Sequence, residues 1–104
     1  MQLPEFVTQE REAVDALCER LHVRRLDLFG SAVRPDFDAQ RSDLDFVVVF
    51  DELPPVEYAD AFFALKEGLE KLFDRPVDLV VEQAIRNPHF KARIEQERQP
   101  VHAG

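Results

Sequence analysis

Three aspartates and a glycine-serine pair have the types and spacing that could support chemistry. Asp43 directly precedes the segment 44–50 and Asp45 is its second residue. The β-branched and aromatic residues of this segment predict a buried strand. Side chains two positions apart on a strand share a face, so we expect the two carboxylates side by side. Such a pair repels itself unless a proton or a cation lies between the groups, and hard divalent ions prefer oxygen ligands. The pair therefore predicts a metal site, with Mg²⁺ as the natural ion.

An Asp-x-Asp sequence at a strand start is also compatible with a solvated turn, but Gly30 and Ser31 favour the metal site. They follow the segment 25–29, which predicts another strand. Glycine lets the backbone approach a ligand closely, and the serine hydroxyl can donate to an anion. A short helical turn starting at Ser31 would add free N–H groups for phosphate. A phosphate site beside paired carboxylates is suited to binding a nucleoside triphosphate.

The third aspartate, Asp78, stands at the second position of a third predicted strand, 77–82. Between this strand and 44–50 lies a long predicted helix that begins near Val56 and has apolar residues at helical spacing. A strand-helix-strand crossover makes the two strands parallel and brings their starts to one edge of the sheet. We therefore expect Asp78 near Asp43 and Asp45. Gly30 reaches the same edge if strand 25–29 is antiparallel to strand 44–50.

The remaining segments predict helices at both ends of the chain. Thr8 is expected to cap a first helix, and Asn87 with Pro88 is expected to start a final one. Inside the long helix, Gly68 indicates a close approach to another element. The loop 35–42 is expected to be exposed beside the site, and the tail 101–104 to be frayed. His89, His102 and the scattered arginines are interpreted as surface residues.

Length and composition limit the classes of function. The 104 residues predict one domain, and no apolar run approaches the length of a membrane span. Because the start of the chain does not resemble a signal peptide, we expect a cytoplasmic protein without membrane contact. The single cysteine, Cys18, is expected in the core. The net charge of -8 argues against direct binding of nucleic acid and favours a basic protein partner.

Taken together, Gly30-Ser31 with Arg34, Ser42-Asp43-Leu44-Asp45 and Val77-Asp78-Leu79-Val80 resemble the nucleotidyltransferase signature of the DNA polymerase beta superfamily. The ending Asn87-Pro88-His89-Phe90-Lys91 with Ile94 is similar to that of its minimal (MNT) branch. The resemblance implies a single minimal nucleotidyltransferase domain over residues 1–104. Its expected fold is a small mixed α/β (α+β) sheet of three or more strands flanked by helices. Where the family usually has glycine after the arginine of its first motif, this chain has Pro35.

The resemblance also implies an activity, the transfer of AMP from Mg-ATP to a hydroxyl with two Mg²⁺ ions. By residue, it implies that Asp43 and Asp45 hold the metals, that Asp78 completes the metal site and helps activate the acceptor, and that Gly30 and Ser31 bind the triphosphate. Two metals can stabilise both the attacking and the leaving oxygens of an in-line displacement. The physical chemistry of converging carboxylates agrees with that allocation.

MNT proteins of this size are similar to antitoxins encoded beside a HEPN-type ribonuclease toxin, which they silence by adding adenylate to a tyrosine. The resemblance therefore implies a separate protein partner, and the negative net charge favours a basic one. Two alternatives stay open at this point. One is a non-catalytic binding antitoxin or regulatory subunit with a degenerate site, and the other is transfer to a small molecule such as an antibiotic.

Overall fold

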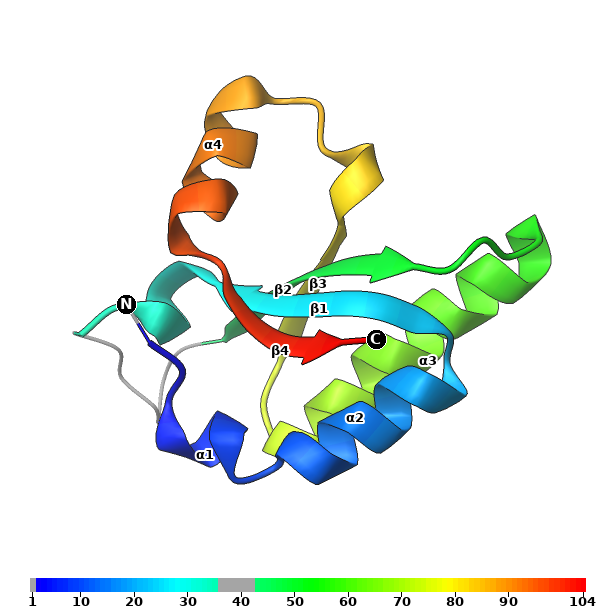
Figure 1. The fold of residues 1–104 in the computed structure, drawn as a ribbon, viewed down its shortest axis with the longest axis horizontal. Coiled ribbons are helices and arrows are strands. Elements are labelled where there is room, and N and C mark those ends of the chain that lie inside the picture. The colour runs from blue at the N-terminus through cyan, green and yellow to red at the C-terminus, as the bar shows by residue number, and fades with distance from the viewer. Residues whose placement is uncertain (1, 36–42) are drawn as a thin grey trace.

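The computed structural model describes residues 2–35 and 43–104, which build a four-stranded sheet in the order β3-β2-β1-β4 (Figure 1). The strands are β1 (Val23–Phe29), β2 (Leu44–Phe50), β3 (Val77–Val81) and β4 (Gln99–Ala103). The α-helices are α1 (Glu5–Thr8), α2 (Arg11–Arg20), α3 (Pro55–Phe73) and α4 (Pro88–Glu97). Short 3-10 helices cover Gly30–Val33 (η1) and Glu82–Ala84 (η2). The mixed α/β fold expected from the sequence is confirmed.

The sheet topology brings the starts of β2 and β3 to the same edge as the end of β1. β2 pairs with β3 in parallel across the α3 crossover, and with β1 in antiparallel. β2 is an interior strand, since both of its neighbours are hydrogen-bonded to it. This position explains why β2 is apolar beyond Asp45, because helices cover both faces of the sheet.

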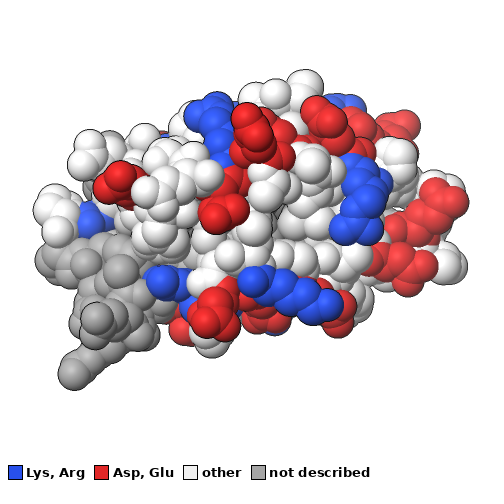
Figure 2. Space-filling model, turned by 90° about the horizontal axis from the view of Figure 1, so that it is seen from below, with Lys and Arg blue, Asp and Glu red and all other residues white. Residues whose placement is uncertain are grey.

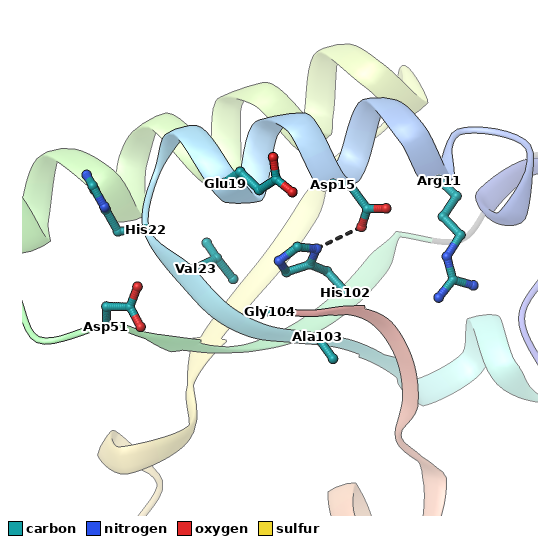
Figure 3. Close-up of a pocket in the computed structure, with 9 residues that line it drawn as sticks. All are labelled: Arg11, Asp15, Glu19, His22, Val23, Asp51, His102, Ala103 and Gly104. Carbon is teal, nitrogen blue, oxygen red and sulfur yellow. Dashed lines mark hydrogen bonds and ion pairs between the residues drawn. The ribbon is translucent and has the colours of Figure 1, made fainter.

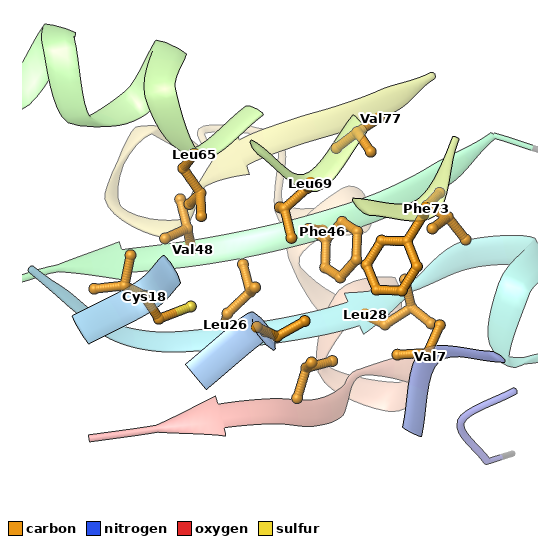
Figure 4. Packing of buried hydrophobic residues seen from close by; sticks show 14 of the residues in the cluster. Val7, Cys18, Leu26, Leu28, Phe46, Val48, Leu65, Leu69, Phe73 and Val77 are labelled. Atoms are coloured by element: carbon orange, nitrogen blue, oxygen red, sulfur yellow. The ribbon is translucent and has the colours of Figure 1, made fainter. Parts of the chain in front are cut away.

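Two hydrophobic clusters fix the helices to the sheet. On one face, the side chains of α2 and α3 pack on alternate residues of β1 and β2, including Leu26, Leu28, Phe46 and Val48 (Figure 4). Cys18 belongs to this core, and burial raises the pKa of its thiol to about 12, with Asp15 and Glu19 adding to the effect. On the other face, α4 packs through Ile94 and Phe90 against Phe29 and Val47.

The N-terminal helix differs from the expectation at its start. Thr8 is the last residue of α1, where its hydroxyl donates to the Glu5 carbonyl, and α2 begins at Arg11 without a side-chain cap. The prediction that Thr8 caps the first long helix is therefore wrong. The expected close approach at Gly68 is confirmed, since a Cβ atom there would lie 2.8 Å from Cδ2 of Leu17. Glycine thus lets α2 and α3 pack closely.

The C-terminal segment is the largest departure from the sequence prediction. The residues expected to fray form β4, which pairs with β1 in antiparallel. Val101 and His102 are buried, with exposed fractions of 2% and 5%. The tail is ordered because β1 would otherwise present an unpaired edge of backbone N–H and C=O groups.

Candidate functional site

Asp45 and Asp78 face each other across neighbouring parallel strands. In the β2-β3 register, Asp45 pairs directly with Asp78, and Asp43 lies just before the first residue of β2. Burial raises the pKa of Asp45 to about 6, with further contributions from the charges of Asp78 and Asp43 and from a hydrogen bond with the Asp78 side chain. The charge of Arg93 acts in the opposite direction. The register thus brings together the carboxylates that the sequence analysis singled out.

Gly30 lies directly against this pair. It follows Phe29, which pairs with Asp45 in the β1-β2 register, and it has a φ of 77°, where residues with a side chain are strained. A Cβ atom at position 30 would lie only 2.3 Å from Oδ2 of Asp45. Ser31, the next residue of η1, is partly exposed. The glycine therefore keeps open the space beside the Asp45 carboxylate.

The donor chemistry of the site fits a magnesium ion bound together with its substrate. Among residues 2–35 and 43–104, no three or more His, Cys, Asp or Glu side chains are grouped so that they could hold a metal ion by themselves. Mg²⁺ usually takes one or two carboxylates and completes its shell with water and substrate phosphates. Two neighbouring carboxylates offer the ligands for such an ion, whose positive charge relieves the repulsion between them. Two aspartates beside the Gly30-Ser31 turn fit that requirement.

Arg34 has a partner that the sequence analysis did not predict. Its Nε and Nη2 atoms donate to Oε2 of Glu97 at 3.0 and 2.7 Å, and Glu97 also accepts from Nε of Arg93 at 3.0 Å. Glu97 is buried, although glutamate is rarely buried unless it is paired. Arg93 lies four positions before Glu97 on α4, but nothing in the sequence pattern indicates that Arg34 joins them.

Arg98 also departs from the prediction of a solvated surface residue. Its side chain is 7% exposed, and it forms ion pairs with Asp27, Glu82 and Glu95. Asp27 is fully buried in β1 and also accepts hydrogen bonds from Nε and Nη2 of Arg25. These pairs tie the end of α4 to the sheet.

A cavity of about 440 Å³ lies at the other end of the strands from Asp45, near the start of β1 and the ends of β2 and β4 (Figure 3). His102 is in this cavity, and its Nδ1 atom lies 2.7 Å from Oδ1 of Asp15. The prediction that His102 is a surface residue is therefore wrong, whereas His89 is exposed as expected. His102 is buried because β4 joins the sheet under α2.

Other predicted features fall outside the described residues. Ser42, which belongs to the second motif, and most of the loop 35–42 are among them.

Comparison with known proteins identifies the family. A model of the nucleotidyltransferase domain family matches residues 10–101. The chain belongs to this family. It is also 38% identical over 81 residues to a Methanocaldococcus jannaschii protein whose name proposes a protein adenylyltransferase, covering 78% of this chain and 79% of that protein. As a family member the chain is a nucleotidyltransferase, and the resemblance drawn from its motifs is confirmed.

Solved structures agree on the fold. A structure described as a proposed minimal nucleotidyltransferase superimposes with a TM-score of 0.68 at 34% identity, covering 96% of both chains. A second, at 18% identity and a TM-score of 0.63, is a complex of an MNT antitoxin with a tri-AMPylated Shewanella oneidensis HEPN toxin, covering 94% of this chain and 73% of the other. A third, at 20% identity and a TM-score of 0.62, is a toxin-antitoxin structure with AMP-PNP, covering 90% and 73%.

The surface of this nucleotidyltransferase is mixed in charge. The face seen in Figure 2 intersperses acidic and basic side chains without a continuous basic area among its described residues. Binding of a nucleic acid backbone would favour clustered Lys and Arg. No helix in the described part of the chain is long and apolar enough to cross a membrane.

Proposed function

We propose that this nucleotidyltransferase transfers AMP from Mg-ATP to a hydroxyl group of a separate protein, a HEPN-type ribonuclease toxin, and so acts as an antitoxin. The proposed acceptor is a tyrosine of the toxin. Residues 1–104 would act as a single minimal nucleotidyltransferase domain. Because ATP is a cytoplasmic metabolite, we place the reaction in the cytoplasm.

The observation that carries the proposal is the Asp45-Asp78 pair with Gly30 against it. Burial and the neighbouring carboxylates raise the pKa of the half-buried Asp45, and the backbone at Gly30 leaves room beside it where any side chain would collide. A purely structural strand end has no need of that arrangement, because like charges in a buried position destabilise the fold. An intact pair therefore favours an active enzyme over a degenerate site.

The proposed roles follow from the place of each side chain. Asp43, Asp45 and Asp78 would hold two Mg²⁺ ions, which when bound would neutralise charge on the phosphates. Gly30 and Ser31 would bind the triphosphate through backbone N–H groups and the serine hydroxyl. Asp78 is exposed, so it can meet a group on another molecule. Asp78 would also accept or orient the proton of the acceptor hydroxyl.

The proposed reaction forms one phosphorus–oxygen bond, breaks another and transfers one proton. The acceptor oxygen attacks the α-phosphorus of ATP, and its proton passes to the Asp78 carboxylate. The bond from the α-phosphorus to the bridging oxygen of the β-phosphate breaks, and pyrophosphate leaves. Positioning and charge stabilisation are the main contributions of a protein to such a transfer.

A protein acceptor is supported by charge and by the similar complexes. A chain with a net charge of -8 meets a basic partner faster, because complementary charge speeds encounter. One of the structures with the same fold is an MNT antitoxin in complex with a tri-AMPylated HEPN toxin. These two findings support a toxin partner over a small-molecule acceptor.

The experiment uses ATP labelled at either the α- or the γ-phosphate, with the candidate partner encoded beside this protein. Label from the α-position should appear on the partner with Mg²⁺ and disappear with Asp43→Asn and Asp45→Asn together. Mg-ATP should also raise the melting temperature of the wild type but not of the double variant. Transfer of the γ-label instead, or an equal thermal shift in both proteins, would overturn the proposal.

A further inference from the structure

A cluster of one buried carboxylate and two arginines joins α4 to the turn that follows β1. Glu97, near the end of α4, has a side chain that is 4% exposed, and its two oxygens accept from different arginines. Arg34 approaches from the C-terminal end of η1, and Arg93 from one turn earlier on α4. The hydrogen bonds are between 2.7 and 3.0 Å long. We call Arg34, Glu97 and Arg93 the arginine clamp.

The clamp lies next to the proposed nucleotide site. The backbone N–H of Arg34 donates to the carbonyl of Ser31 at 3.1 Å, so Arg34 follows the Gly30-Ser31 turn within one turn of chain. The charge of Arg93 is near enough to Asp45 to act on that carboxylate. Phe90 on α4 packs against Phe29, the residue before Gly30, with ring centroids 5.9 Å apart. The clamp therefore connects α4 to the turn that contains Gly30 and Ser31.

Both arginines keep donors that the clamp does not use. Nη1 of Arg34 and both Nη atoms of Arg93 make no hydrogen bond with any residue in the ranges 2–35 and 43–104. The side chains are 40% and 55% exposed, so their remaining N–H groups are open to a ligand. A guanidinium group suits phosphate because its planar donors match two oxygens at once. Holding each guanidinium by one edge leaves another edge for an anion.

The buried Glu97 carboxylate has a physical role between the two arginines. Two arginines beside one anion site repel each other and have many rotamers, and ordering such a side chain on binding costs free energy. A buried carboxylate between them offsets the repulsion and fixes both side chains before the ligand arrives. A solvated surface pair would have little effect of this kind.

We propose that Glu97 is a positioning residue that holds Arg34 and Arg93 ready to bind the phosphates of the nucleotide. This inference rests on the proposed function, since it takes ATP as the ligand of the adjoining site. It assigns Arg34 a phosphate-binding role that survives Pro35, because the guanidinium is held by Glu97 and not by the residue that follows. It also makes α4 a part of the nucleotide site.

The direction in which Glu97→Gln changes nucleotide affinity distinguishes positioning of the arginines from a purely electrostatic effect of the charge. Glu97→Gln removes a negative charge near a site for a polyanion, and Coulomb's law alone therefore predicts tighter nucleotide binding. Loss of positioning predicts the reverse, a weakening on the order of tenfold in Kd for Mg-AMP-PNP. Glu95→Gln is the matched control, because it removes the same charge from the same helix but contacts Arg98 instead of the clamp.

Arg93→Gln provides the second variant in case Glu97→Gln does not fold. Arg93 is more than half exposed, so the fold should tolerate the change, and Kd should again rise on the order of tenfold. Because Glu97 acts through the arginines, the losses of binding free energy in the two single variants should add up to more than the loss in the variant that carries both Glu97→Gln and Arg93→Gln. That non-additivity would be absent if Glu97 only stabilised the fold.

Isothermal titration calorimetry with Mg-AMP-PNP gives the decision for folded variants. Tighter or unchanged binding by Glu97→Gln, or unchanged binding by Arg93→Gln, would overturn the inference while leaving the proposed function intact. Failure of the wild type to bind Mg-AMP-PNP would instead count against the proposed function.

Discussion

At the scale of single residues, Asp45 holds the most informative position, because it is partly buried beside two other carboxylates. Its pKa is raised to about 6, which means that the folded state keeps the proton to a higher pH than the unfolded chain does. The stability from this proton is complete below the unfolded pKa and is lost as the pH rises through about 6. At neutral pH, then, the apo enzyme holds an ionised carboxylate in an unfavourable position.

Asp45→Asn should therefore stabilise the apo protein at pH 7 and not at pH 4. We expect a gain of about 1 kcal/mol at pH 7, a figure reduced for the partial solvent exposure of the site. Urea unfolding at both pH values measures it, and Asp60→Asn, an exposed residue of α3, is the control for the loss of one charge. A gain of the same size at both pH values would contradict the raised pKa.

Gly30 and Ser31 should differ in how much nucleotide binding depends on them. Gly30→Val places a side chain in the space next to Asp45 at a positive φ, so binding of Mg-AMP-PNP should be abolished. Ser31→Ala should lose only one hydrogen bond to a charged group, about 1.5–3 kcal/mol. Circular dichroism checks that both variants fold. If both variants bound Mg-AMP-PNP with wild-type affinity, the phosphates would have to bind away from Gly30 and Ser31.

At the scale of elements, α4 depends on Asn87, the residue that caps its N-terminus. Asn87 accepts hydrogen bonds at its side-chain oxygen from the backbone N–H groups of His89 and Phe90, at 2.8 and 3.2 Å, as the sequence predicted. Asn87→Ala should lower the free energy of unfolding by about 1 kcal/mol, whereas Asn87→Asp should retain the cap. Equal stability of the alanine variant and the wild type in urea would contradict the capping role.

β4 is the element that the sequence analysis missed. Removing residues 99–104 should destabilise the protein by at least about 2 kcal/mol, since Val101 alone loses full burial. It should also cause self-association, because β1 would become an open edge. Thermal melts and light scattering measure the two effects, with removal of Gly104 alone as the control. An unchanged melt would instead agree with a frayed tail.

At the scale of the whole molecule, the sequence predicted those features that depend on local pattern. The strands around Asp45 and Asp78, the α3 crossover and the start of α4 follow from hydrophobic period, turn residues and the handedness of crossovers. The same reasoning could not find β4, because a short segment with Pro100 has no strand pattern until β1 offers its edge. It also missed the clamp, since Arg34 and Glu97 are distant in sequence and meet only through the packing of α4.

The central claim is that this protein uses Asp43, Asp45 and Asp78 to transfer AMP from ATP to a hydroxyl on a partner protein. Intact-mass spectrometry of the partner, after incubation with ATP, Mg²⁺ and this protein, tests it most directly. The wild type should add the mass of one or more AMP groups, with the modification mapping to tyrosine, and Asp78→Asn should keep the complex while stopping the transfer. A partner that binds the wild type tightly but never gains the mass of a nucleotide would contradict the claim.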